Sequence, residues 1–202
     1  MTSLLLLADT TPGTATPRSQ IRAGGRGGRK RGWTLVELLI GLAIAALLVV
    51  LGLPFYGEWI ADYQVLNHAQ LLAGTMNIAR SEAVKRGRRV NLCKSADRQQ
   101  CVAAGGWEAG YVVHVDSDRD GAVDAGEAAL RVEGPATPGI TMRGNRPVDD
   151  YVSYTSLGTA RLLNGGLQMG TITVCKSGRR AIDVILANTG RARIQRTAWV
   201  CP

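Results

Sequence analysis

Residues 30–53 read KRGWTLVELLIGLAIAALLVVLGL, and this stretch decides the class of protein to which the chain belongs. Between residues 33 and 53 the only charged side chain is that of Glu37. A helix of this length, rising about 1.5 Å per residue, would cross a hydrocarbon layer of about 30 Å. The sequence therefore predicts a transmembrane helix over 33–53.

The segment that precedes the apolar stretch is rich in Thr, Pro, Gly and Arg and cannot bury a core. It ends in three cations, Arg29, Lys30 and Arg31, and such flanks tend to stay in the cytoplasm. We therefore expect a single-pass protein of the inner membrane whose C-terminal domain lies in the periplasm. An ordinary secretory signal would carry a small-residue cleavage site after the apolar stretch, and the sequence has none there.

The junction from Gly32 to Glu37, GWTLVE, resembles the processing site of type IV prepilins. The resemblance implies that a prepilin peptidase removes a leader, 1–32, by cleavage after Gly32, and that the new amine of Trp33 is methylated. It also implies a role for Glu37 in assembly, because a charge within an apolar helix costs about 2.5–3.5 kcal/mol unless it is paired. The implied partner is the N-terminal amine of a neighbouring subunit. The alternative is a plain single-pass anchor with a chance match to the motif.

The formal charge of +8 is misleading until it is located along the chain. Residues 1–32 hold six bases and one acid, so the remaining 170 residues carry 18 bases and 15 acids, a net charge of +3. Most of the basicity therefore belongs to the leader. The last 42 residues, however, carry seven bases against the single acid Asp183, and they are the place to look for an anionic partner.

Helical periodicity continues beyond the apolar stretch, over 54–87. One stripe is apolar: Leu66, Ala69, Leu72, Ala73, Met76, Ala79 and Ala83. Lys85 and Arg86 place cations in the last turn, and Gly87 suits a left-handed cap, so the helix is expected to end near Arg86.

From residue 88 to 202 the pattern changes to short β-rich runs separated by Gly, Pro and Asn. The runs are 89–94, 111–116, 128–133, 152–154, 171–175, 182–186 and 191–196. The fold class is therefore α+β: a long N-terminal helix, transmembrane and then amphipathic, packed on a C-terminal antiparallel sheet or small sandwich.

This order, together with GWEAGY at 106–111 and GRAR at 190–193, resembles the FimT/GspH branch of pilin-like proteins. The resemblance implies assembly with other pilins or pseudopilins. It leaves two functions open, a minor pilin that takes part in natural transformation and a minor pseudopilin of a type II secretion system. A third interpretation is priming of pilus assembly without DNA contact.

An arginine cluster near the C-terminus is the predicted DNA-binding element, and its GRAR core resembles the motif of FimT-type pilins. On an extended chain Arg191 and Arg193 share a face while Ala192 points inward. Arg196 has the opposite parity and joins them only if the strand bends. The candidate DNA-binding residues are Gly190, Arg191, Arg193, Arg196, Arg179 and Arg180. The alternative is a solvated arginine face that keeps the surface soluble.

The segment 116–127 matches the calcium loop of EF-hands, with acids at positions 1, 3, 5, 9 and 12 and Gly121 at position 6. The candidate ligands of Ca²⁺ are Asp116, Asp118, Asp120, Asp124 and Glu127. Because the flanks indicate strands instead of helices, the alternative is a hairpin turn whose carboxylates cap backbone amides.

Four cysteines with no C-x-x-C spacing make a zinc site improbable and, in an exported domain, indicate two disulfides. Of the three possible pairings we choose the local one, Cys93 with Cys101 and Cys175 with Cys201. Four buried thiols in a cytosolic protein remain the alternative. No nucleophile elbow or phosphate loop is present, and His68 and His114 are better explained as packing or surface residues, so we expect no enzyme activity.

Overall fold

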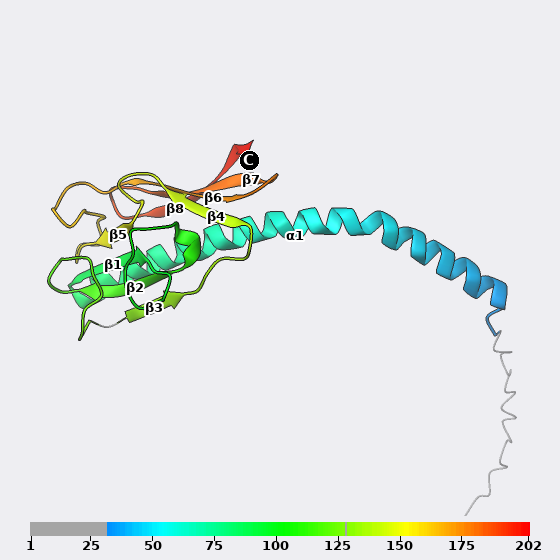
Figure 1. Ribbon diagram of the computed structural model, residues 1–202, viewed down its shortest axis with the longest axis horizontal. Helices are drawn as coiled ribbons and strands as arrows, with labels where there is room; N and C mark the ends of the chain where they lie inside the picture. The colour runs from blue at the N-terminus through cyan, green and yellow to red at the C-terminus, as the bar shows by residue number, and fades with distance from the viewer. Residues whose placement is uncertain (1–31, 128) are drawn as a thin grey trace, which may run out of the picture. The chain divides into compact units, whose positions relative to one another are not determined.

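The computed structural model describes residues 32–127 and 129–202 (Figure 1). The predicted leader lies outside these residues, apart from Gly32. The chain divides between Ala45 and Ala46 into two units.

The long helix α1 runs from Leu35 to Arg86. Its first turn is capped by Thr34, whose Oγ1 accepts a hydrogen bond from the backbone N–H of Glu37 at 3.2 Å. Thr34 and Glu37 thus have the spacing of a capping box, and an acid in the first turn also suits the helix dipole. The helix ends as predicted: Gly87 follows with φ +62°, the left-handed conformation that glycine tolerates.

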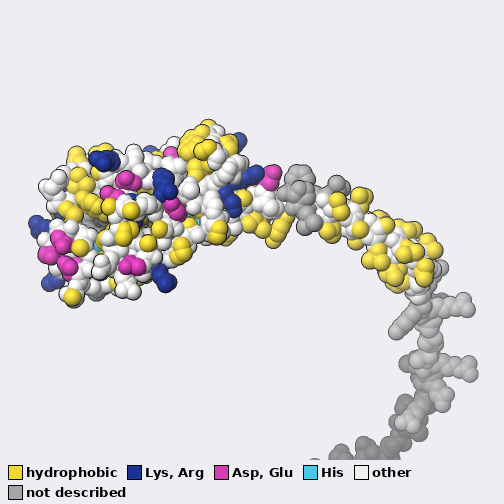
Figure 2. Space-filling model, viewed as in Figure 1, with side chains coloured by type: hydrophobic (Ala, Val, Ile, Leu, Met, Phe, Trp, Pro, Cys, Tyr) yellow, Lys and Arg dark blue, Asp and Glu magenta, His cyan; other side chains and the backbone are white. Residues whose placement is uncertain are grey.

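The large apolar side chains that begin α1 are exposed in the single chain (Figure 2). Leu35 is 74% exposed and Val50 68%, and Trp33, two residues before the helix, is 78% exposed. Among the described residues, we find no helix that combines the length and the apolar character needed to cross a membrane. The predicted transmembrane segment 33–53 includes residues 51 and 53, whose side chains lie outside the description.

The later part of α1 packs on the β-rich domain through the stripe predicted from the sequence. Six of the seven stripe residues are buried, and Leu66 is partly buried against the same core. Alanine at four stripe positions keeps the helix close to the sheets. The amphipathic helix of the sequence prediction is therefore confirmed.

Eight strands form two antiparallel sheets of four strands each within the described residues. The first sheet has the order β3-β2-β1-β5, and the second has the order β4-β6-β7-β8. The strands are β1 (Arg89–Lys94), β2 (Tyr111–Asp116), β3 (Ala129–Glu133), β4 (Ile140–Gly144), β5 (Tyr151–Tyr154), β6 (Gly170–Lys176), β7 (Arg180–Leu186) and β8 (Ala192–Val200).

The core is shared by the later part of α1 and both sheets, and Figure 1 shows this part of the helix running alongside them. The α+β class with antiparallel sheets is confirmed. Strand β4 was not predicted. The strand has only five residues, and two of them are Arg143 and Gly144. Its two buried side chains, Ile140 and Met142, are therefore too few to give a recognisable strand pattern in the sequence.

The first sheet is covered on both faces, since every residue of β2 is buried. Val113 and Val115 belong to the main core, while His114 and Asp116 point to the other face. Lys94 helps to hold the connection after β1 in place. Its ammonium group, 1% exposed, donates to the carbonyl oxygens of Ala103 at 2.7 Å and Gly105 at 3.0 Å and pairs with Asp150 at 2.8 Å.

Candidate functional site

The predicted DNA-binding residues lie at the two ends of the β7–β8 pair. The turn between these strands is closed by hydrogen bonds from Ala187 N to Arg191 O and from Gly190 N to Ala187 O. Gly190 adopts φ +81°, and a Cβ at this position would overlap the carbonyl oxygen of Gly158. Glycine is therefore required here by both backbone conformation and space.

At this turn Arg191 and Arg193 are exposed, whereas Ala192 between them is buried. This is the arrangement expected from strand alternation. Arg193 pairs with Ile185 across the ladder, on the face of β8 that points away from the core. Among the described residues, neither Arg191 nor Arg193 forms an ion pair or a side-chain hydrogen bond.

Arg196 lies on the opposite face of β8, because the ladder runs without interruption from Ala192 to Arg196. The irregularity comes only later, where Ile182 pairs with Arg196 but Arg180 pairs with Val200. The bend that would bring Arg196 to the side of Arg193 is therefore not present.

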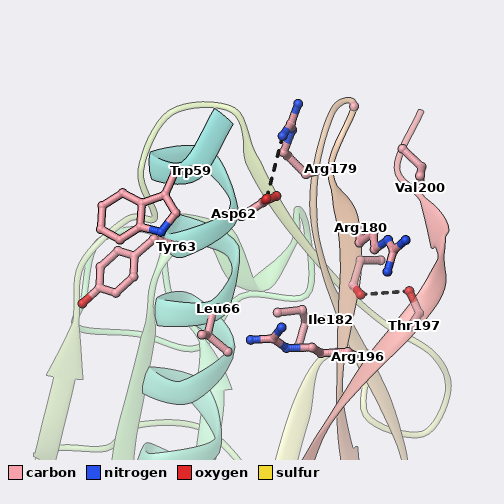
Figure 3. A pocket seen from close by; sticks show the side chains of 12 residues that line it. Trp59, Asp62, Tyr63, Leu66, Arg179, Arg180, Ile182, Arg196, Thr197 and Val200 are labelled. Atoms are coloured by element: carbon pink, nitrogen blue, oxygen red, sulfur yellow. Dashed lines mark hydrogen bonds and ion pairs between the residues drawn. The ribbon is translucent and has the colours of Figure 1, made fainter. Parts of the chain in front are cut away.

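Arg196, Arg180 and Arg179 instead line a cleft of about 630 Å³ between α1 and the β7–β8 pair (Figure 3). The helix side of the cleft is formed by Trp59, Asp62, Tyr63 and Leu66. Arg179 is engaged there, with Nη1 3.4 Å from Glu58 Oε2 and 3.8 Å from Asp62 Oδ2. The structure thus divides the six predicted residues into a hairpin group and a cleft group.

Sequence reasoning missed an aromatic row on α1 beside this cleft. Tyr56, Trp59 and Tyr63 are exposed and stack, with ring centroids 6.4 Å apart for the first pair and 6.0 Å for the second. Their spacing of three and four residues is the signal that places them on one helix face.

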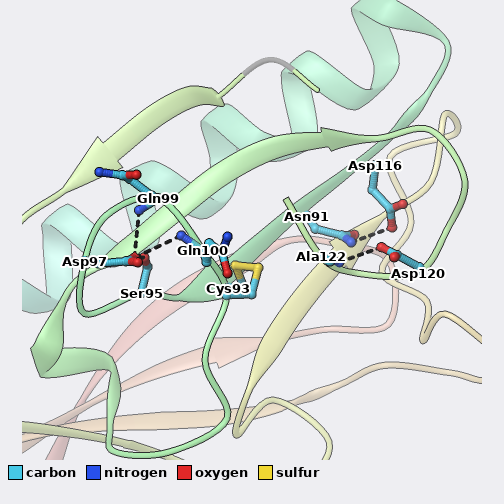
Figure 4. The surroundings of a disulfide bond; sticks show 10 residues. Asn91, Cys93, Ser95, Asp97, Gln99, Gln100, Asp116, Asp120 and Ala122 are labelled. Carbon is cyan, nitrogen blue, oxygen red and sulfur yellow. Dashed lines mark hydrogen bonds between the residues drawn. A yellow bond between two sulfur atoms is a disulfide. The ribbon is translucent and has the colours of Figure 1, made fainter. Parts of the chain in front are cut away.

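The acidic loop brings together three of its five predicted ligands. Carboxylate oxygens of Asp116, Asp118 and Asp120 all lie within 4.8 Å of one another. Asp124 and Glu127 are not part of this group. Figure 4 shows Asp116 and Asp120 beside Asn91 of β1.

The loop also caps itself, as the alternative interpretation expects. Asp116 accepts from Arg119 N at 2.6 Å, Asp118 from Asp120 N at 3.3 Å, and Asp120 from Ala122 N at 2.7 Å. Each bond occupies one carboxylate oxygen and leaves the other oxygen of Asp118 and Asp120 without a hydrogen bond among the described residues.

His114 lies under this loop, fully buried, and neither ring nitrogen has a hydrogen-bond partner among the described residues. Burial lowers its pKa, and this effect outweighs the opposing influence of the nearby acids Glu127, Asp116 and Asp120. Burial also lowers the pKa of His68, whose Nε2 accepts from Thr137 N at 3.2 Å.

Both disulfides of the local pairing are formed. Cys93 joins Cys101, with Cα atoms 5.5 Å apart, and Cys175 joins Cys201, with Cα atoms 5.7 Å apart. The first closes the loop after β1 (Figure 4), and the second ties the chain end after β8 to β6.

Comparison with known proteins gives one family match and several similar folds. The model of the family described as type II transport protein GspH matches residues 68–190. No curated protein matches the chain.

Two of the similar solved structures have TM-scores just below 0.5. The type IV minor pilin FimU of Pseudomonas aeruginosa PAO1 is 22% identical, with a TM-score of 0.49, covering 69% of this chain and 92% of its own. The minor pseudopilin EpsH from the type 2 secretion system of Vibrio cholerae is 11% identical, with a TM-score of 0.46, covering 67% and 99%.

The family match begins in α1 at His68, includes seven of the eight strands and ends at Gly190, one residue before the arginine pair. It covers more than half of the 202 residues. The chain therefore belongs to the GspH family of type IV pilin-like proteins.

Proposed function

We propose that this protein is a minor pilin of a type IV pilus and that it binds extracellular DNA for natural transformation through the β7–β8 hairpin. The observation that carries the proposal is the pair Arg191 and Arg193, which are exposed, lack acidic partners among the described residues, and lie at a turn closed by two backbone hydrogen bonds. The family match stops before both residues, so the assignment depends on their own geometry.

The hairpin offers two cations at a fixed spacing. Residues two apart on a strand are separated by about 6.6 Å, so both guanidinium groups can contact neighbouring phosphates of one DNA strand. The buried side chain of Ala192 fixes the backbone between them. Contacts of this kind read the backbone and not the bases, so we expect binding that is largely independent of sequence and steeply dependent on salt.

The start of α1 supports membership in a fibre. The exposed apolar side chains at the start of α1 need an apolar environment, which neighbouring pilin helices would supply. Before assembly, the stretch 33–53 would hold the subunit in the inner membrane. In this scheme the peptidase cleaves after Gly32, Trp33 is methylated, and Glu37 pairs with the amine of a neighbouring subunit.

The test is DNA binding by the full chain, solubilised in detergent, over a range of salt concentrations. The slope of log K against log salt should be about 1.8 units shallower for the double variant Arg191→Ala/Arg193→Ala, since each phosphate contact contributes about 0.9. The matched control is Arg180→Ala/Arg196→Ala, which removes the same charge from the cleft.

We expect the control variant to retain most of the wild-type slope. Equal slopes for the hairpin variant and the wild type would contradict the proposal. Equal losses in the two variants would also contradict it, because they would reflect net charge and not the hairpin.

The alternative is a minor pseudopilin of a type II secretion system, and the description of the matching family favours it. A deletion strain separates the two functions. Loss of transformation with normal secretion of enzymes supports the pilus function, and the reverse supports secretion.

A further inference from the structure

The acidic loop that connects β2 to β3 covers the outer face of the first sheet. Gly121, with φ +82°, lies close to the sheet: a Cβ there would be 2.7 Å from Leu163 Cδ1 and 4.0 Å from the amide nitrogen of Asn91. The loop thus encloses the side chain of Asn91, which comes from β1 and is fully buried.

The three clustered aspartates have the dimensions of a calcium coordination sphere. Calcium binds oxygen at about 2.3–2.6 Å, so oxygens on opposite sides of one ion are separated by about 5 Å. The oxygens of Asp116, Asp118 and Asp120 lie within 4.8 Å of one another and can therefore contact one common ion. Their i, i+2, i+4 spacing brings them together without a helix on either side.

A second, independent observation comes from buried oxygens that lack partners. The amide group of Asn91 reaches into the cluster, where its nitrogen donates to Asp116 Oδ2, yet its Oδ1 has no hydrogen-bond partner among the described residues. Glu127 is held beside the start of the loop, because its Oε1 accepts from Ser117 N at 2.6 Å. Its Oε2 is also buried without a partner.

An unsatisfied buried oxygen is costly, and a carboxylate oxygen more so. A hard cation held by the three aspartates would offset their mutual repulsion, and Asn91 Oδ1 and Glu127 Oε2 are two oxygens near the loop that no hydrogen bond among the described residues occupies. The cations nearby are Arg119, which lies within the loop, Arg89, which has Asp116 as a neighbour, Arg88, whose Nη1 donates to Ser117 Oγ at 3.5 Å, and Arg86, which lies beside Glu127. Against the five acids of 116–127 these four cations leave an excess of one negative charge.

We propose that the loop 116–127 is a calcium site. Asp116, Asp118 and Asp120, which already lie together, supply the central carboxylates. Glu127, held beside the start of the loop but outside this cluster, closes the shell by moving toward the ion, and the amide of Asn91 turns to offer its oxygen from the sheet beneath. Water completes the coordination. Asp124, exposed and apart from the cluster, contributes through the field of its charge. The site is independent of the arginine hairpin and of DNA.

The test is thermal unfolding and titration calorimetry on the full chain in detergent, after removal of metals with a chelator. For a site in the range of extracellular calcium modules, we expect a Kd of about 0.1–1 mM and one ion per chain. At about 10 mM calcium the unfolding midpoint should rise by roughly 5–10 °C if the Kd is near the lower value. Magnesium at the same concentration should give a smaller rise, since it demands a tighter octahedral shell.

The variant is Asp118→Asn/Asp120→Asn. Both side chains are exposed, and asparagine keeps the oxygen that caps the backbone, so the variant should fold and lose the calcium response. The matched control is Asp97→Asn, whose Oδ1 caps Gln99 and Gln100 in the same manner in another loop. It should keep the full response. A wild-type midpoint that calcium does not move, or an equal rise in the double variant, would overturn the proposal.

Discussion

Gly190 joins the arginine hairpin to the rest of the domain. The carbonyl oxygen of Gly158, against which Gly190 packs, also accepts a hydrogen bond from Arg80 Nε at 2.8 Å. Gly158 has φ +72° and packs against Arg80 and Val84 of the helix. Gly190 therefore has a structural role, because it lets the turn pack against Gly158. The arginines that follow it are the residues that can bind a ligand.

Replacing Gly190 with alanine should destabilise the domain by about 2–4 kcal/mol, because the change adds a steric overlap to the cost of a positive φ. Gly178→Ala is the matched control. Gly178 also adopts a positive φ, +72°, between β6 and β7, but a Cβ there meets no atom within 4 Å. The control should cost only about 1–2 kcal/mol in urea unfolding. Equal costs for the two variants would mean that the contact with Gly158 has no energetic weight.

At the scale of elements, β8 is held unevenly. Its ladder with β7 is regular up to Arg196 and resumes only at Val200, so the last part of the strand depends on other contacts. Cys201 supplies them, through its disulfide to Cys175 and through backbone hydrogen bonds with Gly178 and Arg179. The same contacts fix one wall of the cleft that contains Arg179, Arg180 and Arg196.

Removal of each disulfide by a pair of serines should have unequal effects. The bond from Cys175 to Cys201 spans 26 residues and the bond from Cys93 to Cys101 spans 8. Chain entropy then predicts losses of about 3.5 and about 2.5 kcal/mol, measured by urea unfolding of the oxidised wild type and the two double variants. A larger loss at the shorter loop would show that native contacts, such as those of Lys94, outweigh chain entropy there.

The sequence predicted the elements better than it predicted which side chains meet. The apolar stripe of α1 and the strands β1 and β2 follow from periodicity and from local punctuation, and the structure agrees with them closely. The pairing of Arg179 with Glu58 joins residues 121 positions apart, and no local pattern encodes it. The side on which Arg196 lies depended on whether β8 bends before or after it, which only the register shows.

For the molecule as a whole, the two histidines make folding sensitive to pH. His68 and His114 both have a pKa lowered by burial, so the unfolded chain binds protons more readily than the folded chain. The contribution of the two histidines to stability should be constant well above pH 6.5 and should be lost as the pH drops below that value. The free energy of unfolding should change by at most about 1.4 kcal/mol per pH unit for each histidine.

His114→Leu should make this slope shallower between pH 7 and pH 5.5, because a buried imidazole with no partner is replaced by an apolar group of similar size. The measurement is the urea unfolding free energy at intervals of pH, for the variant and the wild type. An unchanged slope would mean that His114 does not contribute. If His68→Leu alone removed the dependence of the unfolding free energy on pH, the effect would belong to His68 and not to His114.

The contact chain from Arg80 through Gly158 to Gly190 has a mechanical consequence. Along the polypeptide, Arg80 and Gly190 are 110 positions apart, but through space one hydrogen bond and one backbone contact connect them. A pull on the helix at Arg80 therefore reaches the hairpin through few contacts. A load held by Arg191 and Arg193 would be transmitted to the helix without first unravelling the sheets between them.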